Sequence, residues 1–176
     1  MRQSGKKIIL FHFVIAFALL GVCRANAQMK PATPGIQAIM FSKIFSYVRT
    51  INGDEGYSVL VVYENVSNYP QSIVESFSNE GIKVIVTSMD DLPDLAVNPD
   101  IVYLPKGLSA GSIEKINQLP NKLFITGNPD YVFKGKATLG VGLEDERIKI
   151  YINLKLLEGK EHQVSSELIN LARVVE

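Results

Sequence analysis

The chain has 176 residues, of which 18 are basic and 18 acidic, so its formal net charge at pH 7 is zero. The first 27 residues hold four of the basic residues and none of the acidic ones, which leaves 14 basic and 18 acidic residues in the remainder. Nucleic acid and anionic lipid both need a basic footprint, so this acidic remainder excludes them as partners.

The N-terminus has the three parts of a secretory signal peptide. A positively charged start precedes an almost wholly apolar run over Ile8–Val22, and Ala25-Asn26-Ala27 has the small-x-small pattern that signal peptidase cleaves. The apolar run is shorter than the roughly twenty residues that cross a bilayer as a helix. We therefore expect cleavage after Ala27 and export to the periplasm. A lipoprotein attached through Cys23 and a retained membrane anchor are the alternatives.

Removal of 27 of the 176 residues leaves 149, which is enough for one domain. Because Lys30–Gly35 is rich in proline, we expect residues 28–35 to be a flexible lead-in and residues 36–176 to form a single domain. The only cysteine lies in the signal peptide. The mature domain therefore has no disulfide and depends on its hydrophobic core.

The first predicted helix covers Ile36–Ile51, where apolar residues recur at helical spacing. Short apolar runs then alternate with segments of helix length. The predicted strands are Val59–Tyr63, Val84–Thr87, Ile101–Leu104 and Leu123–Thr126, and the predicted helices between them are Gln71–Glu80 and Ser109–Leu119. This βαβ rhythm predicts a mostly parallel sheet with helices on both faces.

The last third of the chain departs from that rhythm. Ala137–Leu143 and Arg147–Ile152 flank an acidic turn and predict an antiparallel hairpin added to the sheet. Alternation places three isoleucines on one buried strand face: Ile148, Ile150 and Ile152. The predicted fold class is therefore α/β, a three-layer sandwich with a mostly parallel central sheet and a C-terminal antiparallel hairpin.

The chain is predicted to close with two helices. A short helix starts at Asn153-Leu154 and breaks at Gly159. The final helix is capped by Ser165 and runs to the last residue. Its expected apolar stripe consists of Leu168, Leu171, Ala172 and Val175.

No pattern in the sequence predicts enzymatic chemistry, a cofactor or a metal site. His162 is the only histidine after the signal peptide and has no cysteine, histidine or carboxylate pair beside it, so we interpret it as a solvated loop residue. Asp90-Asp91, with Asp94 nearby, could attract a cation, but a solvated acidic loop is the favoured interpretation.

A binding role is easier to argue from the residues. Ligands of open parallel sheets bind outside the carboxyl ends of the strands. The candidate lining residues of such a cleft here are Tyr63, Asn65, Lys106 and Asn128. Ordinary loops without a ligand are the alternative.

Both ends of the chain resemble the YfiR/HmsC-like family. Lys149–Leu154, then Gly159 and Val164–Ala172, is similar to the strand, glycine break and closing helix that end its members. Ile36–Val48 resembles their aromatic-rich first helix, and Phe124–Gly127 with the later Gly135 resembles a late strand and loop. The motif residues at the C-terminal end are Asn153, Gly159, Ser165, Ser166, Leu168 and Leu171.

The resemblance implies a periplasmic, non-enzymatic regulator. Such a protein binds and restrains the periplasmic sensor domain of an inner-membrane diguanylate cyclase, which lowers cyclic-di-GMP and biofilm formation. The cysteines that form disulfides in well-known members are absent, and Thr50-Ile51-Asn52 replaces their aromatic-Pro ending of the first helix. A sensor histidine kinase is therefore an alternative partner, and a homodimer is a further option.

Phe41, Phe45 and Tyr47 are the candidate partner contacts, as an exposed apolar surface of the first helix. Core packing of the same side chains is the alternative. The competing function is that of a periplasmic protein that binds a small ligand in the strand-end cleft.

Overall fold

The computed structural model describes residues 29–51, 53, 54, 56–92 and 99–175. The predicted signal peptide, its cleavage site, Cys23 and Asp94 lie outside these residues. Within them, no helix combines the length and the apolar character needed to cross a membrane.

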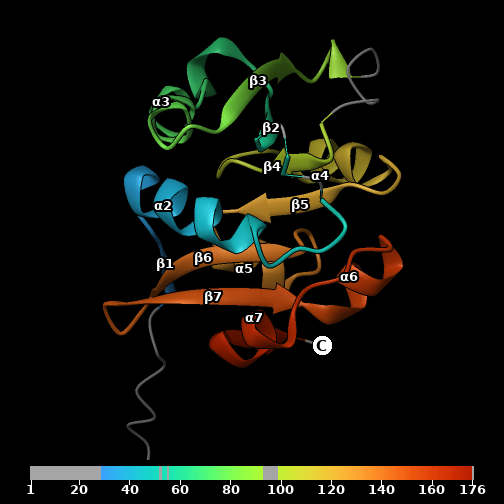
Figure 1. Cartoon of the computed structure of the whole chain (residues 1–176). Helices are drawn as coiled ribbons and strands as arrows, with labels where there is room; N and C mark the ends of the chain where they lie inside the picture. The colour runs from blue at the N-terminus through green and yellow to red at the C-terminus, as the bar shows by residue number, and fades with distance from the viewer. Residues whose placement is uncertain (1–28, 52, 55, 93–98, 176) are drawn as a thin grey trace, which may run out of the picture.

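One sheet of eight strands runs through the molecule in the order β3-β2-β4-β5-β6-β7-β8, with β1 paired to β6 beside this path (Figure 1). The strands are β1 (Met29–Pro31), β2 (Ser58–Tyr63), β3 (Lys83–Ser88), β4 (Ile101–Tyr103), β5 (Leu123–Thr126), β6 (Leu139–Glu144), β7 (Arg147–Asn153) and β8 (Ala172–Val175). The helices are α2 (Pro34–Phe45), α3 (Gln71–Asn79), α4 (Ala110–Asn117), α5 (Pro129–Phe133), α6 (Leu154–Gly159) and α7 (Ser166–Leu171), with a short 3-10 helix η1 at Val66–Asn68.

The central strands are parallel, as their continuous apolar runs predict. β2 pairs with β3 and β4, β4 pairs with β5, and β5 pairs with β6, all in parallel. The side chains of Val59–Val62 are buried on both faces of β2, which is typical of parallel strands covered by helices. The predicted antiparallel hairpin is also confirmed, since β6 and β7 pair in register from Leu139↔Ile152 to Glu144↔Arg147.

Helices cover both faces of the sheet, which makes the predicted three-layer arrangement correct (Figure 1). On one face, buried side chains of α2, α3 and α7 pack with alternate strand residues such as Val61 and Ile125. On the other face, side chains of α4 and α5 pack with the intervening residues, such as Val62 and Phe124. The period of two along each strand thus divides the core into two halves.

The structure differs from the predictions at both ends of α2. Met29–Pro31 form β1, antiparallel to β6, so the segment expected to be a flexible lead-in contributes a strand to the sheet. The helix ends at Phe45, well before the predicted Ile51, because the chain turns there. Val48 then forms an antiparallel bridge with Val164. Backbone pairing with a distant segment therefore replaces the last predicted helical turns.

The final helix is shorter than predicted. α7 ends at Leu171, and Ala172–Val175 continue as β8, which pairs in parallel with β7. The Ser165 cap is confirmed, because its Oγ accepts a hydrogen bond from the backbone N–H of Leu168. The expected apolar stripe is wrong in part, since Leu168 is buried but Leu171 is 67% exposed. Ile148, predicted to be buried, is also exposed.

Candidate functional site

The predicted cleft residues all lie at or just after the carboxyl ends of strands, but the protein's own groups engage two of them. Asn65 caps η1 through reciprocal hydrogen bonds with Asn68. The ring of Tyr63 packs edge-on against that of Tyr69, with centroids 5.3 Å apart. Lys106 is exposed and Asn128 is half-buried. The parallel topology puts the four at one edge of the sheet, but no hydrogen bond or ring contact described joins any two of them.

Glu64 lies between Tyr63 and Asn65 in the chain, at the carboxyl end of β2, and its side chain is also engaged within the protein. Its Oε1 accepts a hydrogen bond of 2.7 Å from the backbone N–H of Ser109, the N-cap of α4. Hydrogen bonds from the Ser109 side chain, the Ser112 side chain and the Ser109 backbone lower the pKa of Glu64, while burial opposes them. A carboxylate therefore already sits at the start of α4, where the helix dipole favours negative charge. Sequence inspection missed this role because Glu64 and Ser109 are far apart in the chain.

The protein also has a hollow of about 540 Å³, whose lining shares no residue with the predicted cleft. It lies between the segment after β3 and the last part of α4. Its lining residues are Met89, Asp90, Leu92, Lys115, Gln118 and Leu119. The volume falls in the range of roughly 300–1,000 Å³ that small-molecule sites occupy. Among the described residues, no group of three or more His, Cys, Asp and Glu side chains could hold a metal ion.

Two of the three predicted partner contacts, Phe41 and Phe45, lie in the core and not on the surface. Phe41 and Phe45 have no exposed surface, so the expectation that they are exposed is wrong and the alternative of core packing holds for them. Phe41 lies 6.0 Å from Phe45 and 6.2 Å from Phe77 by ring centroids, and Phe45 lies 5.1 Å from Tyr57. The helix carries apolar residues over a wide arc because α3 covers one flank while the sheet covers another.

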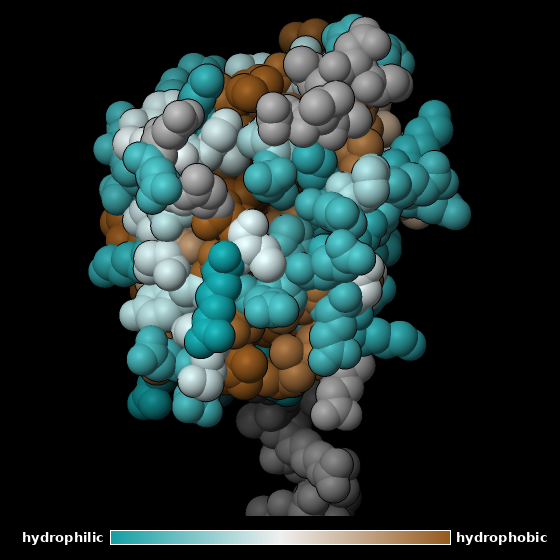
Figure 2. Space-filling view, turned by 45° about the vertical axis from the view of Figure 1, so that its right-hand side comes forward, coloured by the Kyte–Doolittle hydropathy of each residue, from teal (hydrophilic) through white to brown (hydrophobic). Residues whose placement is uncertain are grey.

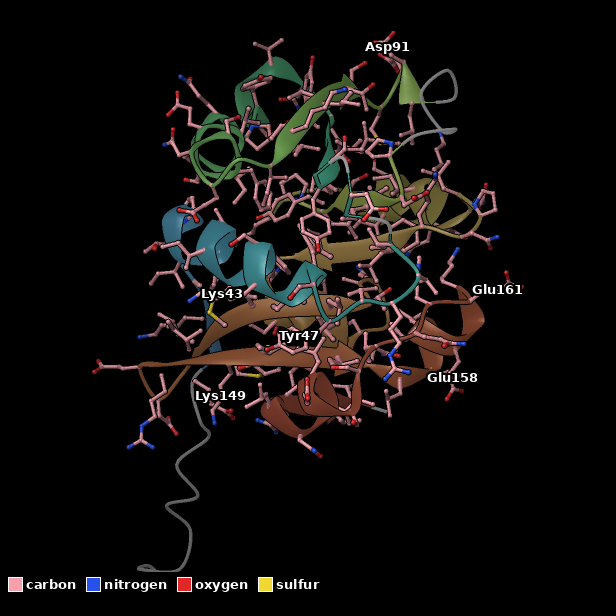
Figure 3. All side chains as sticks on the ribbon, in the orientation of Figure 1. Lys43, Tyr47, Asp91, Lys149, Glu158 and Glu161 are labelled. Carbon is pink, nitrogen blue, oxygen red and sulfur yellow. The ribbon has the colours of Figure 1, made fainter. Side chains whose placement is uncertain are left out.

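Tyr47 is the one candidate of this set that keeps partial exposure. It follows the end of α2, and its backbone carbonyl accepts a hydrogen bond from the N–H of Ser165, just before α7. Figure 3 shows Tyr47 beside α7, toward the lower part of the sheet and away from Asp91 at the opposite end of the molecule.

Three exposed apolar side chains belong instead to the elements at the β7–β8 end of the sheet. We call Ile148 of β7, Leu171 of α7 and Val174 of β8 the C-terminal patch; they are 46%, 67% and 37% exposed. β8 is the last strand of the sheet, and it pairs with β7 alone among the described residues. Figure 2, which keeps the vertical direction of Figure 1, shows apolar surface exposed at the lower end of the molecule, the end where β7 lies.

The motif residues at the C-terminal end mostly hold local structure. Asn153 links two elements, because its Oδ1 accepts from the N–H of Leu156 and its Nδ2 donates to the carbonyl of Val132. Gly159 ends α6, and Ser166 begins α7. Leu171 is the exception, since its side chain points into solvent.

His162 lies in a different environment from the one predicted. The residue is only 7% exposed, so its interpretation as a solvated loop residue is wrong. Its Nδ1 lies 2.8 Å from the hydroxyl of Thr50. The sequence around it is polar, and its burial comes from segments that are distant in the chain, which is why the local pattern did not reveal it.

Solved structures with similar folds include two bacterial proteins. One is the crystal structure of a conserved domain protein from Vibrio cholerae, with a TM-score of 0.60 and 17% identity over 83% of this chain and 61% of that one. Another is an ABC domain in complex with L-Trp from Streptococcus pneumoniae, with a TM-score of 0.58 and 11% identity over 82% of this chain and 60% of that one. The chain thus spans about 60% of the length of each, and the likeness shows a shared fold.

The comparison with curated proteins found no match. The sequence profile of the YfiR/HmsC-like family, in contrast, matches residues 35–173, almost the whole described chain. This family is known for periplasmic regulation of cyclic-di-GMP signalling and is a regulator type, not an enzyme family. The resemblance at the two ends of the sequence is thereby confirmed, and the chain belongs to the YfiR/HmsC-like family.

Proposed function

We propose that the protein is a periplasmic, non-enzymatic regulator that binds the periplasmic sensor domain of an inner-membrane signalling protein and restrains its output. The preferred partner is a diguanylate cyclase, and a sensor histidine kinase is the alternative. Family membership supports the cyclic-di-GMP assignment. The signal peptide pattern, with cleavage after Ala27, supports export.

The observation that carries the proposal is the C-terminal patch beside the open edge of β8. Among the described residues, three of the six exposed large apolar side chains, Ile148, Leu171 and Val174, belong to β7, α7 and β8 at this side of the sheet. A scattered exposed apolar residue needs no explanation, whereas a gathering of them marks interaction surfaces. An open strand edge adds unpaired backbone N–H and C=O groups that a partner segment can bond. Tyr47 remains a candidate contact because it lies beside α7 and is half-exposed.

A charge on this patch tests the proposal. Leu171→Asp places a carboxylate on a side chain that is 67% exposed, so folding is expected to survive while partner binding is lost. The matched control is Val66→Asp, whose side chain is 84% exposed in η1, outside the patch. The readouts are co-purification with the membrane partner and the cellular cyclic-di-GMP level, which is expected to rise with Leu171→Asp and to stay unchanged with Val66→Asp. Equal binding by both variants would rule out the patch as the contact surface.

A second candidate function is small-ligand binding in the hollow of about 540 Å³ between Asp90 and Lys115. One acidic and one basic side chain over an apolar floor suit a small zwitterion. A ligand that binds only the folded state raises the melting temperature. A metabolite screen by thermal shift, repeated with Lys115→Met, tests this function, and a flat response across the screen rejects it.

A further inference from the structure

Residues Lys160–Ser165 cross the amino-terminal edge of the parallel strands, and we call this segment the clasp. Its backbone is tied to the exit of α2 at two points. The N–H of Arg49 donates to the carbonyl of Gln163 at 2.8 Å, and the N–H of Ser165 donates to the carbonyl of Tyr47 at 2.9 Å. The clasp leads directly into α7 and β8, so it sets where these last elements attach.

The first residue of the clasp is fixed on another helix. The ammonium of Lys160 donates to the carbonyls of Asn117 and Leu119, at 2.7 and 3.0 Å, where α4 ends. It also lies 5.1 Å from the centroid of the Phe124 ring. Lysine is favourable at a helix C-terminus, since it satisfies orphan carbonyls and complements the dipole. This end of the clasp is thus held by the Lys160 ammonium, whose pKa burial lowers.

The centre of the clasp is the buried ring of His162. Its Nδ1 shares a hydrogen bond of 2.8 Å with the hydroxyl of Thr50. Its Nε2 is buried and makes no hydrogen bond within the part of the chain that the structure describes. In the neutral ring, Nε2 carries at most one N–H without a hydrogen-bond partner. A protonated imidazole would carry a buried positive charge, which the nearby Lys122 backbone offsets only in part.

The charged groups around the ring add to this penalty. Asp100, Lys122 and Lys160 face it from the residues before β4, before β5 and at the start of the clasp. Burial lowers the pKa of His162 most, and the Lys122 and Lys160 charges act in the same direction, whereas the Lys122 backbone and the Asp100 carboxylate oppose them. The Asp100 carboxylate is itself paired with the Lys122 ammonium at 3.8 Å and is exposed to solvent, so it would offset the charge of a protonated ring only weakly.

We propose that the clasp is a proton-sensitive latch, in which protonation of the buried His162 ring frees Lys160–Ser165 from the exit of α2 and loosens the attachment of α7 and β8. In the open state the ring has the ordinary histidine pKa of about 6.5. In the closed state the pKa of His162 is lower. The closed state is therefore fully favoured at pH values above about 6.5, and it loses stability as the pH falls from that value toward the lowered pKa. The latch does not depend on the proposed partner.

Amide hydrogen exchange of the full chain tests the latch. The reporters are the N–H groups of Arg49 and Ser165, which open with the clasp. The references are the amides of β2 and β4 in the centre of the sheet. Between pH 7.5 and 5.5, protection factors at the reporters are expected to fall by up to roughly tenfold per pH unit below the ordinary pKa, as one linked proton requires. Protection at the references is expected to hold.

His162→Gln keeps a polar side chain that does not titrate, so reporter protection in this variant is expected to be independent of pH. Thr50→Val keeps the imidazole and removes its hydroxyl partner, which should lower reporter protection at every pH while the pH dependence remains. If His162→Gln does not fold, Thr50→Val and an NMR titration of the His162 ring test the latch instead. A ring pKa at or above 6.5, the same loss of protection in His162→Gln, or an equal loss in β2 and β4 would overturn the latch.

Discussion

The side chain of Gln37 occupies the space where a β-carbon on residue 127 would lie, since its carboxamide atoms are 2.1 Å from that position. The same carboxamide is fixed at both ends. Its Oε1 accepts a hydrogen bond of 2.6 Å from the hydroxyl of Tyr103, and its Nε2 donates to the carbonyl of Ala32 at 2.7 Å. Gly127 therefore permits a buried polar connection between α2 and the parallel strands.

Gly127→Ala should displace Gln37 and break this connection. We expect the free energy of unfolding to fall by about 2 kcal/mol or more, from overpacking and from buried polar groups left without partners. Urea unfolding measures the change. The control is Gly111→Ala in α4, where an added β-carbon meets open space, and a gain of roughly 0.5–1 kcal/mol is expected from helix propensity. An equal loss in both variants would contradict the role of Gln37.

Phe41→Ala should destabilise the protein by about 3–5 kcal/mol, because it opens a cavity between α2 and α3 where the ring has no exposed surface. Ile39→Ala, on the outer side of the same helix and 43% exposed, should change stability far less. Chemical denaturation compares the two. A loss of stability in Phe41→Ala as small as that in Ile39→Ala would contradict the burial of Phe41 and support α2 as a partner surface.

Glu64→Gln should change the acid stability of the protein. The folded-state pKa of Glu64 is lowered, first by the Ser109 side chain, so this carboxylate stabilises the fold above its ordinary pKa of about 4.5 and the contribution is lost as pH falls through the lowered value. Melting temperatures from pH 6 to pH 3 should therefore decline less steeply in the variant than in the wild type. Identical slopes would show that the bonds to Ser109 and Ser112 do not favour the ionised form.

A chain that stops after Leu171 lacks β8 and uncovers the edge of β7 from Ile150 to Asn153. An uncovered apolar strand edge pairs with other chains, so the truncated protein should be less stable and should associate. Light scattering and thermal unfolding report the two effects. A stop after Val175, which keeps β8, is the control and should behave like the full chain.

The sequence predicts the centre of the sheet well because local pattern and environment agree there. The run Val59–Tyr63 is apolar at every position, which is typical of a strand covered on both faces. The hairpin of β6 and β7 is similarly local, since its turn at Asp145 and Glu146 joins adjacent segments and both residues adopt positive φ. Short-range information is sufficient for elements of this kind.

The predictions that failed involve partners from distant parts of the chain. Ala172–Val175 are compatible with a last helical turn, and it is pairing with β7 that makes them a strand. Periodicity continues past Phe45, but the bridge from Val48 to Val164 ends the helix earlier. His162 is assigned incorrectly and the burial of Phe41 is left open for the same reason, because burial depends on which segments pack against a side chain and not on its neighbours in sequence.

β6 divides one of its edges between two strands, with β5 alongside Leu139–Gly140 and β1 alongside Gly142–Glu144. β1 is the first strand to leave the ribosome, yet its partner is made near the end of synthesis. During that interval Met29–Pro31 have no strand to pair with, and the closing of so long a loop is slow. β1 is therefore expected to dock last, onto a β6 edge that β5 already occupies in part.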